Sequence, residues 1–552
     1  MAVAFCPATH FFVPVGGSVH MGASLRALRA LVLLAGFYLL GVFLLAALGG
    51  IDYAVVTTLH GPIVAKLVLA SLVLTVPIVR GMFMLRTPKG EPLAGVTVTE
   101  AQEPELWAVV RDIAQQVGTR APDEIVLIDE VNAAVGEDAK LLGLRPGTRR
   151  LYLGLPLMTG LDEMQLRAVL AHEMGHYANF DTRLTPLIAR GRAQLIRTIG
   201  YFHDRADKKV AKERAKQERK DEKRIAKGKK AKGVDTAGEG AMYRAMAKIY
   251  IAYGNFYMRA TRSTSRRQEL AADLASVRVA GRDSAASALR ELNALGSAHD
   301  FYMGSYATLG VGAGLLPRPG EVFGGLRRLL AARSADLDEL RQELSTEPTS
   351  PYDSHPALAE RVARIEALPD DGRAGQAARP ALELLADADA ALAALEQVVL
   401  TPEALALKRV DWEDLVHESM TVYVGQGAED LRETFAAEGA GPGLDAVLDA
   451  FDADPAVRWR IADRFPKSEE AEAATGRTAR EFARPVVRRA LNQLVTVELT
   501  ARGAARWQLS WSDSASLQYP ADGFEDRLGE ALDAAVSDLP DTEPLRKLVL
   551  AP

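Results

Sequence analysis

An uncharged apolar run from Leu31 to Gly49, LVLLAGFYLLGVFLLAALG, limits the possible folds of this chain more than any other feature. A helix rises about 1.5 Å per residue, so the run is just long enough to cross a hydrocarbon core of roughly 30 Å. A second apolar stretch extends from Ile63 to Leu85, with Lys66 and Arg80 placed where they could reach lipid headgroups. We therefore expect a transmembrane helical hairpin; the alternative is a buried hairpin of a water-soluble domain.

The charges around the two runs predict their orientation. The connecting segment 50–62 contains no Lys or Arg, whereas basic residues flank the other ends of both runs: Arg26, Arg29, Arg80, Arg86 and Lys89. The positive-inside rule then places both ends of the hairpin in the cytoplasm. The first run is too long and starts too late for a cleaved signal peptide, and Met21 is a candidate true start. We expect a multi-pass protein of the plasma membrane whose water-soluble part is cytoplasmic.

Composition narrows the chemistry that the rest of the chain can use. Its 552 residues exceed what one hydrophobic core usually holds, so two or three structural units are expected. A formal net charge of −6 gives no overall indication of nucleic-acid binding, and we expect none. Cys6 is the only cysteine, which excludes an intramolecular disulfide and a thiolate metal cage. Any metal ion would need His and carboxylate ligands.

Hydrophobic periodicity predicts a mainly α fold of the α+β class with a small sheet. The pattern favours helices at Pro104–Val117 and Leu161–Asn179 and strands at Glu124–Ile128 and Arg150–Leu155. Asp162 with Gln165 resembles a capping box at the start of the second helix. The expected units are an N-terminal tail at 1–24, the hairpin at 25–89 with spans at about 31–49 and 63–85, a main domain at 90–368 and an accessory α+β domain at 369–552.

Two segments after the second helix are unusually polar. Residues 184–202 repeat apolar side chains at helical spacing, but arginines interrupt any run of membrane length, so we expect an amphipathic helix. The lysine-rich insert at 205–235 lacks the apolar content for a core and is expected to be a solvated helix or a disordered loop. It could contact anionic lipid headgroups, or it could simply be solvated. In the accessory domain, Leu494–Thr500 and Trp507–Trp511 are possible strands.

The motif His172-Glu173-Met174-Gly175-His176 lies within the helix expected at Leu161–Asn179. Histidines four residues apart share one helix face and can offer two imidazoles to one metal ion, with Glu173 beside them facing a bound water. This is the pattern of a hydrolytic zinc site.

A catalytic zinc ion needs a third protein ligand. Asn179 and Thr182 stand where the metzincin pattern requires Gly and His, which excludes that arrangement. A glutamate from a later helix is the other option, and Glu269 fits it. Asp273, one turn on, would accept a hydrogen bond from the non-ligating nitrogen of a zinc histidine, preferably His172. Such a pair taken alone would be ordinary surface charge.

Three segments together resemble the HtpX and CAAX prenyl protease family of membrane zinc metallopeptidases: HEMGHYANFDTR, SRRQELAADLA, and Ser354-His355-Pro356 running to Arg361. The resemblance covers roughly Pro92 to Leu368. It implies a zincin-like catalytic domain that binds Zn²⁺. It departs from many members in the interval between the zinc helices, where an arginine-interrupted, lysine-rich stretch replaces two further membrane spans.

The resemblance also implies roles for three more residues. His355 would stabilise the oxyanion of the tetrahedral intermediate and Arg361 would help to position it, although Ser354 could instead be only a helix cap. Asn132 would lie at the rim of the cleft, where an extended substrate adds to an edge strand, or it could be a plain turn residue.

Together these features predict a membrane-anchored zinc endopeptidase that hydrolyses peptide bonds in membrane or cytoplasmic proteins. Glu173 would take a proton from the metal-bound water and return it to the leaving amine. Two alternatives stay open: a catalytically silent, zinc-stabilised membrane scaffold, and a protease specific for prenylated peptides. Glu173 argues against the scaffold, because a structural site needs no base.

Overall fold

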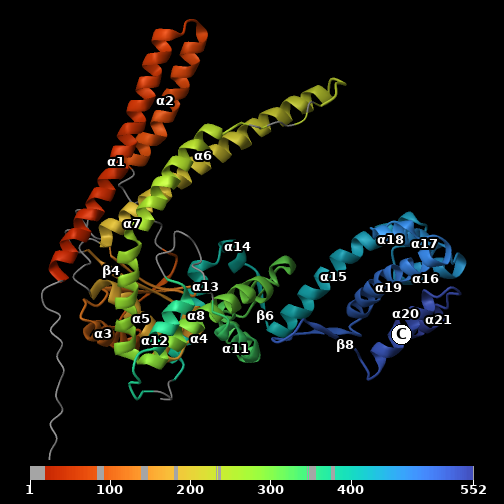
Figure 1. Cartoon of the computed structure of the whole chain (residues 1–552). Helices are drawn as coiled ribbons and strands as arrows, with labels where there is room; N and C mark the ends of the chain where they lie inside the picture. Colours follow the sequence, from red (N-terminus) through yellow and green to blue (C-terminus); the bar gives the residue numbers. More distant parts are fainter. Residues whose placement is uncertain are drawn as a thin grey trace, which may run out of the picture.

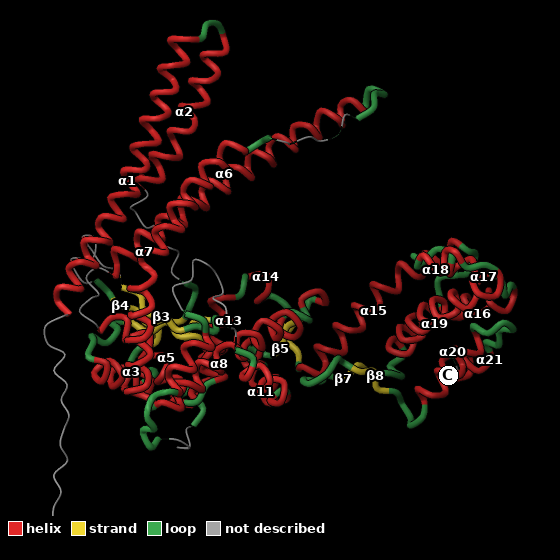
Figure 2. The backbone as a smooth tube through the Cα atoms, in the orientation of Figure 1, coloured by secondary structure: helices red, strands yellow, loops and turns green. Residues whose placement is uncertain are grey.

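The computed structural model describes residues 19–83, 93–137, 147–178, 185–231, 233, 236, 238–344, 346, 356–373 and 379–550. Helices dominate these residues, and the strands form one four-stranded sheet and two strand pairs (Figure 2). The α+β prediction with a mainly helical chain is therefore confirmed. Two helical hairpins project from the part that contains the larger sheet, and α15 (Trp412–Ala437) leads from it to a C-terminal helical body (Figure 1).

The first hairpin pairs α1 (Val19–Thr58) with α2 (Pro62–Phe83). Gly61 turns the chain between them with a φ of 92°, a conformation that favours glycine. Among the described residues, one helical stretch, Ala35–Thr58, is long and apolar enough to cross a membrane, and the apolar part of α2, Pro62–Val76, is shorter. The first predicted span at 31–49 thus has a matching helix, whereas the second at 63–85 stays a prediction.

The second hairpin pairs α6 (Thr185–Ile225) with α7 (Ala241–Ala280). The expected amphipathic helix continues without a break into the lysine-rich insert, which is helical as far as Ile225. Near the base, the two hairpins share one apolar cluster: Leu33, Phe37, Leu74, Ile78, Met82, Leu195, Phe202, Met246, Ala247, Tyr250 and Tyr257. Beyond this cluster α6 and α7 lean away from α1 and α2 (Figure 1).

The larger sheet has the strand order β1-β2-β4-β3. Its strands are β1 (Val96–Val98), β2 (Glu124–Ile128), β3 (Ala133–Glu137) and β4 (Arg149–Gly154). β2 and β4 are parallel, while β1 and β3 pair antiparallel at the two edges. The helices next to this sheet in sequence are α3 (Pro104–Val117), α4 (Leu155–Gly160) and α5 (Glu163–Ala178).

The capping box at the start of α5 forms as predicted. The backbone N–H of Gln165 donates to Asp162 Oδ1 at 2.7 Å, and the N–H of Asp162 donates to Gln165 Oε1 at 3.0 Å. This reciprocal pair satisfies two helix N–H groups that have no partner within the helix. It fixes where the helix that carries the His-Glu-x-x-His motif begins.

One large core continues past the predicted boundary at residue 369. It contains Leu106 and Leu151 near the sheet but also Leu392, Trp412 and Leu415. The segment after residue 369 joins this core through β6 (Lys408–Val410), which pairs with β5 (Leu315–Pro317) in a parallel two-stranded sheet. The boundary at 369 therefore does not mark the end of this core.

The elements between the second hairpin and the C-terminal body are α8 (Arg282–Tyr302), a π-helical turn (Met303–Ala307), a 3-10 turn (Val311–Ala313), β5 (Leu315–Pro317), α9 (Glu321–Gly324), α10 (Leu326–Ala332), α11 (Ser334–Gln342), α12 (Leu358–Glu366), a 3-10 turn (Ala381–Leu384), α13 (Ala388–Val399), α14 (Pro402–Leu405) and β6 (Lys408–Val410).

The C-terminal body has a separate core of its own. Its elements are α15 (Trp412–Ala437), α16 (Leu444–Ala453), α17 (Val457–Ala462), α18 (Glu469–Ala473), α19 (Gly476–Ala501), β7 (Arg506–Gln508), β8 (Ser516–Gln518), α20 (Phe524–Ala535) and α21 (Glu543–Val549). The strand predicted at Leu494–Thr500 is wrong, because this segment lies in α19. Its β-branched residues suggested a strand, but Leu491, Leu494 and Val495 are buried at helical spacing. The strand predicted at Trp507–Trp511 forms in part, as β7.

Candidate metal centre

The candidate centre lies where α5 packs against α7. Gly175 permits this contact, because a Cβ at this position would come within 3.1 Å of both Ala272 Cα and Ala275 Cβ. Ser276 Oγ on α7 also donates a hydrogen bond to the Ala168 carbonyl on α5 at 2.8 Å. The glycine of the motif therefore favours close packing of the two helices, because a side chain here would force α7 to shift by a few tenths of an ångström.

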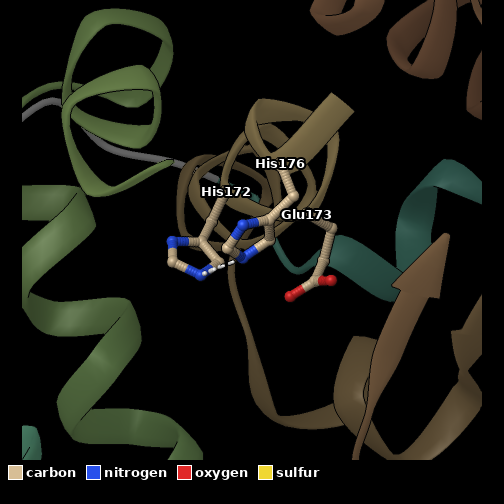
Figure 3. Close-up of side chains that lie close together, drawn as sticks. All are labelled: His172, Glu173 and His176. Atoms are coloured by element: carbon tan, nitrogen blue, oxygen red, sulfur yellow. Dashed lines mark hydrogen bonds between the residues drawn. The ribbon is translucent and has the colours of Figure 1, made fainter. Parts of the chain in front are cut away.

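Two imidazoles and one carboxylate converge in this contact. His172 Nε2 and His176 Nε2 are 3.2 Å apart, and they lie 3.6 Å and 3.7 Å from Oε2 and Oε1 of Glu269, respectively. Figure 3 shows the two rings side by side, with the Glu173 carboxylate next to them on the same helix. Two ligand atoms at about 2.1 Å from a tetrahedral zinc ion would lie roughly 3.4 Å apart. The donor set and its spacing fit zinc.

Asp273 and Arg361 hold His172 from its buried side. The His172 Nδ1 atom lies 3.0 Å from Asp273 Oδ1, as expected for an orienting carboxylate. Arg361, on α12, donates from Nη2 to Asp273 Oδ1 at 2.6 Å and from Nε to Oδ2 at 3.2 Å. Arg361 Nη2 is also 3.2 Å from His172 Nδ1. The structure thus places Arg361 beside the imidazole, where it contacts Asp273; its role in positioning the oxyanion stays a prediction.

The electrostatics of the centre favour a positive charge at His172. Burial by itself would lower the pKa of His172, but hydrogen bonds to Asp273 and Glu269 outweigh burial and raise it to about 9. Burial would raise the pKa of Asp273, yet hydrogen bonds with His172 and Arg361 lower it. Asp273 therefore stays ionised at neutral pH. Two buried carboxylates lie beside the two imidazoles, and the histidines could ligate a metal ion in their neutral form.

The other predicted site residues are less closely connected to the centre. Asn132 is exposed and directly precedes β3, and its carbonyl accepts a hydrogen bond from the Gly154 N–H at 2.9 Å. Its backbone thus extends the sheet at the edge next to α5. His355 and Ser354 lie outside the described residues.

Tyr177 was not singled out from the sequence, although it touches the sheet edge directly. Its hydroxyl donates to the Val135 carbonyl on β3 at 2.5 Å. The signal that could have found it is its spacing, because it follows Glu173 by four residues and so shares the helix face of the candidate base.

Residues 100–368 match the family model of peptidase family M48. Among curated relatives, a "Protease HtpX homolog" of Janthinobacterium sp. (strain Marseille) is 31% identical over 135 residues, which is 22% of this chain and 43% of the relative. The homolog of Limosilactobacillus fermentum is 26% identical over 157 residues, 28% of this chain and 48% of the relative. The matches thus span less than half the length of these relatives. No solved structure matches the chain.

Proposed function

We propose that this chain is a zinc-dependent endopeptidase with Glu173 as its general base, because residues 100–368 match the family model of peptidase family M48 and the chain is similar to HtpX homologs. The carrying observation is the convergence of His172, His176 and Glu269 at the spacing of tetrahedral zinc ligands. The substrates of such an enzyme would be extended segments of membrane or cytoplasmic proteins.

The roles of the protein groups follow from their positions. A bound zinc ion would supply an activated water and polarise the scissile carbonyl. Glu173 would accept the proton of that water on its carboxylate and deliver it to the leaving amine. Asp273, itself held by Arg361, would fix the tautomer and orientation of His172. By family resemblance, His355 would donate to the oxyanion and Asn132 would help to bind the substrate.

The direct test is Glu173→Gln, which keeps the shape of the side chain but removes the base. We expect full zinc content by mass spectrometry and a loss of roughly 10²- to 10⁴-fold in casein or peptide cleavage. Glu418→Gln, an exposed glutamate on α15 that pairs with Lys408, is the matched control and should cleave like wild type. If Glu173→Gln cleaves as well as wild type, Glu173 is not the base. If neither wild type nor Glu173→Gln retains zinc, the assignment of the metal ligands fails.

We further propose that α1 and α2 anchor the protein in the plasma membrane as a multi-pass hairpin, with the metal centre on the cytoplasmic side. Large apolar side chains on both helices face outward, including Leu39 and Phe43, each 67% exposed, and Leu69 and Leu72, each 61% exposed. Such a surface is costly in water and favourable in lipid. Alkaline extraction should leave the wild type in the membrane fraction; release into the supernatant would contradict an integral anchor.

The outer part of α6 is proposed to lie on anionic headgroups. Residues 205–233 hold 14 basic and 5 acidic residues, so this arm carries +9 while the remainder of the chain carries −15. Most of its described basic side chains are exposed, and it starts at the apolar cluster that α6 shares with the hairpin. Replacing Lys208, Lys212, Lys216 and Lys220 by Gln should weaken binding to phosphatidylglycerol vesicles, with the difference disappearing at high salt. If the variant and wild type bind the vesicles equally at low salt, the arm is merely solvated and does not contact headgroups.

A further inference from the structure

β3 is an edge strand, and the pairing of the sheet shows which of its backbone groups face outward. Neighbouring residues of a strand direct their N–H and C=O groups to opposite sides. The Asn132 carbonyl accepts from the Gly154 N–H of the paired strand β4, so positions 132, 134 and 136 face β4. The backbone groups of Ala133, Val135 and Glu137 therefore face the free edge. These are the groups that a peptide lying alongside β3 could use.

One of these outward groups is already occupied. The Tyr177 hydroxyl donates to the Val135 carbonyl, which also confirms that this carbonyl points away from β4. A peptide residue opposite Val135 could still accept from the Val135 N–H, but its own N–H would have to share the carbonyl oxygen with the Tyr177 hydroxyl, which occupies one of its two lone pairs. Since adding a strand depends on both bonds of such a pair, Tyr177 weakens the edge at this position.

Contacts with Arg149 hold the Tyr177 side chain in place. The Arg149 guanidinium lies over the Tyr177 ring, 4.8 Å from its centroid. Arg149 is itself fixed by an ion pair with Glu137 at 3.0 Å and by a hydrogen bond to the Arg120 carbonyl at 2.6 Å. Both Arg149 and Glu137 belong to the β4–β3 pair, so ring, cation and edge strand form one connected unit.

The position of this cap relative to the reaction follows from helix and strand geometry. Tyr177 is one turn after Glu173 on the same face of α5, about 6 Å further along the helix. The capped Val135 carbonyl therefore contacts the same face of α5 that carries Glu173.

We propose that Tyr177 is a specificity-determining residue that weakens, at Val135, the backbone ladder between β3 and a substrate. This inference rests on the proposed peptidase function and deepens it. Substrate segments opposite Val135 then gain the bond from the Val135 N–H but not a full bond to its carbonyl. The enzyme consequently accepts segments that are extended only near the cleaved bond, such as loops and chain ends, as readily as long extended ones.

Tyr177→Phe tests this by removing the hydroxyl while keeping the ring. The assay uses one cleavable sequence extended residue by residue in both directions and measures kcat and KM separately. In wild type, the extension that reaches Val135 should gain in kcat/KM only what the bond from the Val135 N–H contributes, and Tyr177→Phe should gain more. In Tyr177→Phe the same extension should lower KM by roughly 2- to 10-fold, the contribution of one net hydrogen bond. The gain should lie in KM, because pairing away from the reacting bond binds substrate and transition state equally.

N-methylation of each peptide nitrogen in turn identifies the bond. Methylating the nitrogen that would donate to Val135 should abolish the gain in Tyr177→Phe and leave wild-type cleavage unchanged. Tyr152→Phe removes a hydroxyl from the neighbouring strand β4 and should keep the wild-type length profile. Identical length profiles in wild type and Tyr177→Phe, or a uniform fall in kcat for all peptides, would overturn the proposal. If wild type cleaves none of the peptides, the peptidase function itself fails.

Discussion

The sheet-containing part and the C-terminal body differ in where their interacting ionisable side chains lie: buried in the first and mostly at the surface in the second. In the first, His172, Glu269, Asp273 and Arg361 are each less than 10% exposed and contact one another. In the second, ion pairs such as Arg488–Asp533 and the contacts of Arg546 with aspartates of α16 lie at the surface. Burying a charge costs several kcal/mol unless it is paired and hydrogen-bonded. A group of buried ionisable residues that contact one another therefore indicates a functional site. Surface pairs cost little and contribute little.

Arg458 is the exception in the C-terminal body and sharpens the contrast. It is 1% exposed, and its recorded hydrogen bonds go to the backbone carbonyls of Pro455 and Ser537. Burial lowers its pKa. A cation held by carbonyls fixes the chain locally, whereas the buried set around His172 combines two acids and two imidazoles in a geometry that suits a metal ion.

The largest effect should come from breaking the C-terminal core. Phe451, fully buried between elements of that body, stacks on Phe435 with ring centroids 6.4 Å apart. Phe451→Ala should destabilise the C-terminal body by about 3–5 kcal/mol, seen as faster hydrogen exchange across α16 and α19. Peptide cleavage at low temperature should stay within about twofold of wild type, because the two cores are separate. A parallel loss of activity would show that the bodies are coupled.

Next in size is Asp273→Asn, which removes the charge that orients His172. Loss of such a supporting carboxylate typically weakens metal binding by roughly 10- to 100-fold, measurable by competition with a chromogenic zinc chelator. Asp533→Asn in the C-terminal body is the matched control, because its partner Arg488 is at the surface. Unchanged zinc affinity in Asp273→Asn would mean that Asp273 does not support the metal ligand.

A smaller effect is expected where the two parts meet. Trp511 stacks on Tyr306 at 5.0 Å and contacts the Trp412 ring at 5.1 Å, and its carbonyl accepts from Arg333. Trp511→Ala should cost about 1–2 kcal/mol through the two aromatic pairs. Small-angle scattering should then show a broader range of distances between the bodies, with both cores still folded. An unchanged scattering profile would indicate that α15 alone sets their arrangement.

The smallest effect belongs to the surface charges. Arg546 pairs with Asp445, Asp449 and Asp452 at 2.5 to 3.2 Å, yet these aspartates are largely open to solvent. Arg546→Gln should therefore change the unfolding free energy by about 1 kcal/mol or less, and the difference should shrink in high salt when urea unfolding is followed by circular dichroism. A loss above about 2 kcal/mol would mean that the network acts like a buried one.

Local sequence determined the features that depend on neighbours within a few residues. The spacing of His172 and His176, the Asp162–Gln165 capping box, the bounds of α3 and β2, and the apolar run in α1 all follow from helical or strand periodicity and from charge. These interactions act over one or two turns, so the sequence alone contains them. The need of a catalytic zinc ion for a third protein ligand pointed to Glu269 in a distant segment.

Only the tertiary structure decided which distant groups meet and in which register. Glu269 follows His176 by 93 positions, and its approach depends on Gly175 allowing α5 to pack closely on α7. The placement of Arg361 behind Asp273, the helical state of Leu494–Thr500 and the extension of the core beyond residue 369 likewise depend on contacts between remote segments. The Tyr177 cap depends on strand pairing, where a shift of one residue would turn the Val135 carbonyl toward β4. Periodicity fixes which face a side chain takes, but the partner of that face is set by packing of the whole chain.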